Sequence, residues 1–178
     1  AAAARESIEA ELAAAMEAGE IADAALAASE AQREMFWRLR ETIPEAQSRE
    51  GASIKHDISV TTSELPRFIV EGGALVAQLL PGARLVSYGH LGDGNLHFNL
   101  SPPQGANNQE FLRLAPQVNR AVHDLVARYG GSFSAEHGIG QLKRAELLRY
   151  KNPVAVELMR SIKQAVDPNG IMNPGKVL

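Results

Sequence analysis

The sequence predicts an α+β domain in which helices cover an antiparallel sheet. Three observations lead to this fold class. Residues 54–60 alternate between apolar and polar side chains, as a strand with one buried face does. Residues 84–88 and 96–100 form two more strand-like segments, separated by a turn-rich stretch that is typical of a hairpin. Apolar side chains recur with helical period over 65–79 and 118–129, which supplies helices to cover the sheet.

The composition excludes several classes of function. Of the 178 residues, 45% are hydrophobic and 22% are charged, as in ordinary globular proteins. A net charge of −3 argues against a nucleic-acid partner, because such proteins carry a basic excess. No apolar run approaches the roughly 18 to 20 residues of a membrane helix. The absence of cysteine excludes thiolate metal sites and cysteine nucleophiles, and it fits a reducing, cytoplasmic location.

Two helices are expected before the first strand. Apolar residues at helical spacing over 8–16 predict one helix, and a capping-box pattern at Ser29 and Gln32 begins another that ends at Pro44. A polar loop is expected over 47–51. The apolar side chains of the second helix that we expect to pack in a core are Met35, Phe36 and Trp37.

The bounds of the later elements are predicted from capping and helix-breaking residues. Ser63 is placed to cap the 65–79 helix, and Pro116 interrupts a helical stretch that begins near Asn108. A short strand is expected over 132–135, then helices over 142–150 and 154–166 and an irregular tail. We interpret His56, on the apolar side of its strand, and His123, on the polar side of its helix, as structural.

Two histidines and a glutamate form a candidate metal site. His90 and His97 are separated by seven positions across a glycine-rich turn, which can place both imidazoles at one end of a hairpin. Glu136 is the best third ligand, and such a set leaves coordination positions open for water or substrate. The alternative is that both histidines are exposed or hydrogen-bonded and that the glycines serve the turn. A strand follows the glycines, so they match no phosphate-binding motif.

Three more residues are candidates for chemistry. His137 follows Glu136, and an imidazole beside a metal carboxylate is suited to act as a general base. Neighbours in a strand point to opposite faces, so both serve one site only if the chain leaves strand geometry there. Arg40 and Lys55 are cations that can anchor a small acid, although each can equally be a solvated surface charge.

Three segments together resemble the C-terminal domain of FAD-linked oxidases. They are residues 89–97, 134–140 and 167–176, in that order, and the likeness runs from about Ala24 to the end. This family contains D-lactate dehydrogenases, the glycolate oxidase flavin subunit and D-2-hydroxyglutarate dehydrogenase. The resemblance implies a ferredoxin-like substrate domain spanning residues 1–178, with FAD and a divalent metal, zinc or manganese, as cofactors.

The resemblance also implies a role for each matching residue. His90, His97 and Glu136 match the metal ligands, and His137 matches the base that takes the proton of the substrate's C2 hydroxyl while a hydride passes from C2 to the flavin. The remaining matches are Arg40, Lys55 and Asn99 for the substrate and Asn173 for the flavin. The substrate implied is a small D-2-hydroxy acid, such as D-lactate or glycolate.

Two departures from the family pattern qualify this expectation. Pro44 stands where the hydroxyglutarate-type enzymes tend to carry a hydroxyl-bearing residue, which leaves that substrate open. Nothing in the sequence resembles the family's N-terminal domain, which binds the flavin pyrophosphate, so we expect a fragment that is inactive alone. Two other classes are a non-catalytic binding or oligomerisation module, motivated by the apolar faces at 8–16 and 118–129, and a metal-dependent hydrolase. A homodimer is compatible with any of them.

Overall fold

The computed structural model describes residues 2–178, and its internal contacts divide the chain into two compact units, Ala1–Ala46 and Gln47–Leu178. The first unit contains helices α1 (Ala2–Glu17) and α2 (Glu30–Glu41). Helix α3 (Ile43–Arg49) spans the boundary. The remaining elements, which carry the α+β core, belong to the second unit.

Helix α2 confirms the predicted cap but not the predicted packing. The Ser29 hydroxyl accepts a hydrogen bond from the Gln32 amide at 3.3 Å, and the Gln32 side chain accepts one from the Ala28 amide at 2.7 Å. The expectation of a buried apolar face is wrong, since no residue of α2 is buried in the described chain. An apolar stripe is buried only where another element packs on it. The exposed side chains are Met35 at 51%, Phe36 at 38% and Trp37 at 58%.

The sheet has the predicted antiparallel hairpin and a third strand. Strands β2 (Arg84–His90) and β3 (Asn95–Ser101) form the hairpin, and β1 (Asp57–Ser59) pairs with the other edge of β3. Asp57 and Tyr88 both lie opposite His97. Because side chains alternate between faces, this register separates an apolar face from a polar one. Ile54 extends the pairing through an isolated bridge to Leu100.

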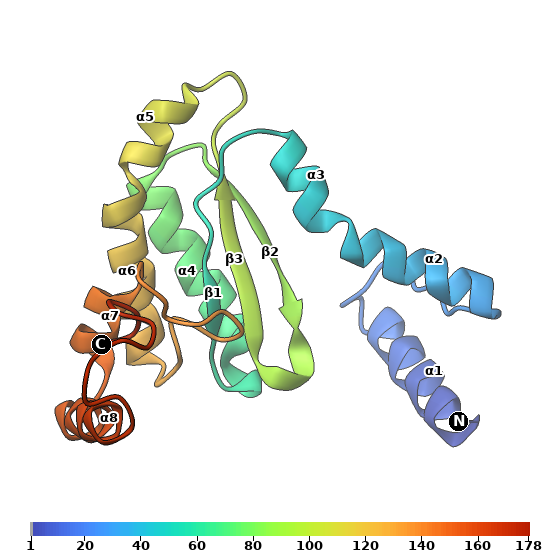
Figure 1. The fold of residues 1–178 in the computed structure, drawn as a ribbon. Coiled ribbons are helices and arrows are strands. Elements are labelled where there is room, and N and C mark those ends of the chain that lie inside the picture. The colour runs from blue at the N-terminus through green and yellow to red at the C-terminus, as the bar shows by residue number, and fades with distance from the viewer. Residues whose placement is uncertain (1) are drawn as a thin grey trace. The chain divides into compact units, whose positions relative to one another are not determined.

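Helices α4 (Leu65–Leu79) and α6 (Ala115–Arg128) cover the apolar face, so the core lies between one side of the sheet and these helices (Figure 1). Phe98 of β3 contacts Phe68 of α4 edge-on, with ring centroids 5.7 Å apart. Both rings are fully buried. The inner stripe of α6 is part of this core through Val118, Val122, Leu125 and Val126.

The other elements lie around this core. They are the 3-10 turns η1 (Thr62–Glu64) and η2 (Leu91–Asp93) and the helices α5 (Asn108–Arg113), α7 (Arg144–Tyr150) and α8 (Pro153–Val166). None of the helices described in residues 2–178 is both long enough and apolar enough to cross a membrane.

Three local expectations are corrected. Residues 47–49 are helical rather than loop, because Pro44 lies in the first turn of α3, where its missing N–H costs no hydrogen bond. Ser63 lies inside η1, and the residue that precedes α4 is Glu64. The segment 132–135 forms a single bridge, between Ser132 and Ser59, instead of a strand.

The hairpin turn depends on Gly94. Its φ of +67° lies in the left-handed region, and a Cβ built on it would lie 2.0 Å from the Val60 carbonyl oxygen. The same stretch of backbone is fixed by a hydrogen bond from the Val60 amide to the Gly94 carbonyl at 3.0 Å. Close approach of β1 to the turn therefore requires a residue without a side chain here.

Gly94→Ala is expected to destabilise the chain by at least about 2 kcal/mol, because strain and the clash with the Val60 carbonyl add. Gly92→Ala is the matched control, since an added Cβ there meets nothing within 4 Å. Urea unfolding of the two variants measures the difference. Equal midpoints would contradict this account of the turn.

Two histidines lie in the buried interior beneath β1. His56 is 3% exposed, and its Nδ1 donates a hydrogen bond to the Phe98 carbonyl at 2.7 Å. His123 contacts it edge-on, with ring centroids 5.8 Å apart, and pairs with Glu146 at 3.1 Å. The prediction that His123 lies on the polar side of its helix is wrong, because the buried stripe of α6 is broad enough to include it.

The buried His56 makes stability depend on pH. Burial lowers the pKa of His56 from 6.5 to about 4, so the unfolded chain binds this proton more readily than the folded chain. The contribution is complete above pH 6.5, and it is lost as the pH falls towards 4, amounting to at most about 3 kcal/mol.

We expect the free energy of unfolding to fall less steeply in His56→Asn than in the wild-type chain between pH 6.5 and 4. Asparagine preserves a donor near the Phe98 carbonyl but does not titrate. Urea unfolding across a pH series tests this, and parallel curves for the two proteins would contradict it.

Candidate metal and substrate site

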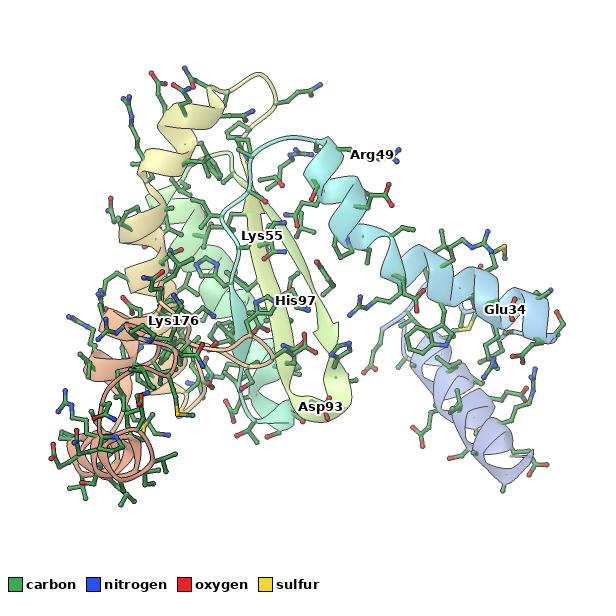
Figure 2. The ribbon with its side chains drawn as sticks, in the orientation of Figure 1. Glu34, Arg49, Lys55, Asp93, His97 and Lys176 are labelled. Atoms are coloured by element: carbon green, nitrogen blue, oxygen red, sulfur yellow. The ribbon has the colours of Figure 1, made fainter. Side chains whose placement is uncertain are left out.

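The polar face of the sheet carries the candidate site. Asp57 and His97 are opposite each other on β1 and β3, and His90 ends β2 beside the hairpin tip. Figure 2 shows His97 and Lys55 over these strands, and Asp93 at the tip. The strands thus bring together side chains that are 40 positions apart in the sequence, from 57 to 97.

His90, His97 and Glu136 meet in the described structure. The His90 Nδ1 lies 2.8 Å from one Glu136 carboxylate oxygen, and the His97 Nε2 lies 3.4 Å from the other. The two imidazole centroids are 6.4 Å apart. His97 is the most enclosed, with 17% of its side chain exposed, against 47% for His90 and 41% for Glu136.

The chemistry of these donors suits a divalent cation. Ligand atoms bonded at about 2.1 Å to one tetrahedral zinc ion lie about 3.4 Å from each other, close to each of the two contacts between imidazole and carboxylate. These contacts use different Glu136 oxygens, and in the described residues the group whose donor atoms all lie within 4.8 Å of one another is Asp57, His97 and Glu136. Two nitrogen donors and a carboxylate are typical of zinc or manganese rather than calcium. The partial exposure of His90 and Glu136 leaves room for further ligands. Metal binding by these residues stays a prediction.

His137 lies beside this set, on the segment that leaves strand geometry. Its ring centroid is 6.4 Å from that of His97, and 68% of its side chain is exposed. Residues 135–137 adopt bends rather than strand conformation, which allows the neighbours Glu136 and His137 to serve one site. The imidazole is therefore accessible to a small molecule bound against the cluster.

Asp57 is the functional candidate that sequence reasoning missed. Its side chain is 3% exposed, and its donor atoms come within 4.8 Å of those of His97 and Glu136. One carboxylate oxygen accepts hydrogen bonds from the backbone amides of Glu136 and His137, and the other accepts one from Asn95. The signal was present in the alternation of β1, which assigns Asp57 to the face opposite His56.

Hydrogen bonds and a neighbouring imidazole stabilise the negative charge of the buried Asp57 carboxylate. Burial by itself would raise the pKa of the Asp57 carboxyl. The two backbone N–H groups and the His137 imidazole outweigh burial and hold this pKa below its ordinary value. Lys143 is a cation that interacts with Asp57: burial lowers the pKa of Lys143, while the Asp57 charge acts in the opposite direction.

The two predicted substrate residues of this unit have different surroundings. Lys55 is exposed at the edge of the polar face (Figure 2), so its ammonium can meet an anion. Asn99 is 3% exposed, and its amide donates to Gln47 at 3.0 Å and accepts from the His56 amide at 3.2 Å. Asn99 thus connects β3 to α3 and to the residue that precedes β1, and contact with substrate stays a prediction.

The remaining two predicted residues lie outside the cluster. Arg40 belongs to α2 in the unit Ala1–Ala46, and its substrate role stays a prediction. Asn173 lies in the C-terminal tail with a φ of +46°. It lines a largely apolar pocket of about 580 Å³ with residues of α8, including Ile162 and Val166. Its approach to a flavin also stays a prediction.

A family model described as FAD linked oxidases, C-terminal domain, matches residues 1–177. The chain belongs to this family. The match begins upstream of Ala24, where the motifs placed the start of the likeness. This result confirms the predicted family, and the helix-covered antiparallel sheet confirms the predicted α+β class.

Several curated relatives that match the chain are named D-2-hydroxyglutarate dehydrogenase. A D-2-hydroxyglutarate dehydrogenase of Stutzerimonas stutzeri is 42% identical over 162 residues, which are 91% of this chain and 35% of that protein. One from Xanthomonas citri pv. viticola is 40% identical over 91% of this chain and 34% of its own length. A mitochondrial one from Arabidopsis thaliana is 40% identical over 98% of this chain and 30% of its own length. The chain thus spans about a third of the length of these relatives.

The chain's glycine-rich turn does not fit the flavin's phosphates. A strand rather than a helix follows Gly94, and a Cβ at Gly89 would lie 2.1 Å from the Asn95 carbonyl oxygen. Both glycines therefore serve close packing of backbone on backbone, and their amides form no cradle at a helix N-terminus. This turn is therefore not the part of the described residues that would hold the FAD of this family.

Proposed function

We propose that the chain is the substrate- and metal-binding part of an FAD-linked dehydrogenase that oxidises a D-2-hydroxy acid to the 2-oxo acid. The convergence of two imidazoles and a carboxylate beside His137 carries this proposal. The family match and the names of the relatives support the reaction class. D-2-hydroxyglutarate is the first substrate to test, although Pro44 departs from the hydroxyglutarate pattern, with D-lactate and glycolate as the alternatives.

His90, His97 and Glu136 would hold a zinc or manganese ion. When bound, such an ion withdraws electron density from the substrate's hydroxyl oxygen and lowers its pKa. The exposed Lys55 ammonium attracts the substrate carboxylate and orients the molecule on the polar face. Lys55 thus restrains the carboxylate end of the substrate before any bond changes.

His137 takes the hydroxyl proton on a ring nitrogen, with Nδ1 already directed towards the Asp57 carboxylate at 3.5 Å. The C2–H bond breaks with both electrons, and this hydride would pass to the FAD that the family uses. C2 and its oxygen then form the carbonyl of the 2-oxo acid, so one proton and one hydride leave the substrate in total. The buried apolar face of the sheet holds the strands that carry Asp57 and His97.

One of the two apolar faces that favoured a non-catalytic module is not exposed in the structure. The apolar face at 118–129 is buried against the sheet through Val118, Val122 and Leu125, so it offers no surface to a partner. The face at 8–16 remains exposed at Ile8 and Met16. Exposure of two side chains on one helix is common in monomers and selects no function.

The test is a chimera in which this chain replaces the matching third of the Stutzerimonas stutzeri relative. Reduction of a dye is measured with D-2-hydroxyglutarate, D-lactate, glycolate and, as a control, L-2-hydroxyglutarate. The proposal expects turnover with at least one of the first three and none with the L-isomer. A chimera that retains flavin but oxidises none of them, while the intact relative is active, would overturn it.

A further inference from the structure

The segment that carries Glu136 and His137 is held in place by side chains rather than by a sheet. Its last regular pairing is the bridge between Ser132 and Ser59. Beyond this bridge, the Ala135 amide donates to the Asp57 carbonyl at 3.1 Å, and the next two amides both donate to the Asp57 carboxylate. The position of both side chains is therefore determined largely by one residue of β1.

The geometry at the Asp57 carboxylate is specific. A single oxygen accepts the Glu136 amide at 2.9 Å and the His137 amide at 2.8 Å, so two successive N–H groups converge on one anionic atom. Such charge-assisted hydrogen bonds are about twice as strong as neutral ones. The same oxygen lies 3.5 Å from the His137 Nδ1.

A second contact holds the segment from the opposite side. The Lys143 ammonium donates to the Ser134 hydroxyl at 2.9 Å, and that hydroxyl donates to the His137 carbonyl. Lys143 thus fixes where the segment begins and ends, whereas Asp57 fixes the two residues that carry the chemistry. Only Asp57 among these contacts also reaches an imidazole.

We propose that Asp57 is a positioning residue for the reaction, which orients the Glu136 carboxylate towards the histidine pair and holds the His137 imidazole with its Nε2 free. This inference rests on the proposed function for its purpose. A carboxylate beside Nδ1 favours the neutral tautomer that carries its proton there, and the lone pair of Nε2 then faces the substrate side.

Two substitutions of Asp57 distinguish the effect of its negative charge from the effect of its hydrogen-bond acceptors on the segment. Asp57→Asn can still accept both backbone amides with its remaining oxygen. Its new NH2 group replaces the oxygen that accepts from the Asn95 NH2 group, so the Asn95 amide must flip to present its side-chain oxygen, which has no partner in the described residues. Asp57→Ala removes the acceptor altogether. Glu146→Gln is the matched control, because Glu146 is a mostly buried carboxylate with two partners, Arg120 and His123, outside the cluster.

Amide exchange in the 178-residue chain reports the position of the segment, measured by NMR without metal or substrate. In Asp57→Ala the Glu136 and His137 amides should exchange at least about tenfold faster than in the wild type, and in Asp57→Asn within about threefold of it. Unchanged exchange in Asp57→Ala would overturn the proposal. Equal acceleration in Glu146→Gln would also overturn it, because the effect would then be general destabilisation.

The 15N signals of the His137 imidazole, recorded in mildly alkaline buffer, report the tautomer. Both Asp57 variants should shift the population away from the Nδ1–H form, and Glu146→Gln should not. In the chimera, Asp57→Asn should lower kcat by about tenfold or more and leave KM nearly unchanged. An unchanged tautomer with unchanged kcat would overturn the proposal. A chimera that oxidises none of the hydroxy acids would contradict the proposed function. The amide exchange and the His137 tautomer would still test the positioning role of Asp57.

Discussion

Glu136→Gln is expected to lower the affinity of the chain for Zn²⁺ and Mn²⁺ by about 100-fold or more. Glutamine has nearly the same shape but removes the negative charge that lies between the two imidazoles, 2.8 Å from one and 3.4 Å from the other. Isothermal titration of the chain with each metal measures the change. Metal binding by a carboxylate and two neutral imidazoles needs that anion, so the loss should exceed any effect of a surface substitution.

Glu146→Gln serves as the control for this titration, since it removes a partly buried carboxylate that pairs with His123 outside the cluster. Its metal affinity should equal that of the wild-type chain. Equal affinity in Glu136→Gln and the wild type would contradict the assignment of Glu136 as a ligand. Both variants change a glutamate to a glutamine. A difference in metal affinity between them is therefore due to where the glutamate lies in the fold.

His137→Gln is expected to lower turnover of the chimera by about 10²- to 10⁴-fold, the usual contribution of a positioned general base. Its side chain is 68% exposed and is not a member of the core, so the fold should tolerate the change. Flavin content, metal affinity and unfolding midpoint should therefore stay close to those of the unsubstituted chimera.

The measurement compares kcat, KM and flavin absorbance for the variant and the unsubstituted chimera with the same hydroxy acid. A fall in kcat with little change in KM is expected, because the base acts in the transition state rather than in binding. Normal turnover in His137→Gln would exclude this residue as the base.

Much of the second unit was predictable because its elements are locally specified. Four predicted features are observed: the alternation of residues 54–60, the glycine turn at 89–94, the helix break at Pro116, and the separation of the last two helices between 150 and 154. In each case the pattern lies within one turn or one pair of strands. There the spacing of apolar side chains and the backbone preferences of the residues predict the same structure.

The errors lie where burial depends on a distant partner. An amphipathic pattern predicts that one helix face is apolar, but not whether another element covers it, and the face of α2 stays exposed. His123 failed for the opposite reason, because contacts from β1 and α7 enclose a polar residue. The sequence likewise could not show that Asp57 meets a segment 79 positions later, since that contact is made by side chain on backbone.

The alternation of one sheet keeps the candidate site and the hydrophobic core on separate sides. Phe98 and His97 are adjacent in the chain, yet one packs under α4 and the other faces the cluster. Substitutions on the polar face thus leave the packing beneath the sheet intact. Alternate positions of the three strands can therefore change on that face without compensating changes in the interior.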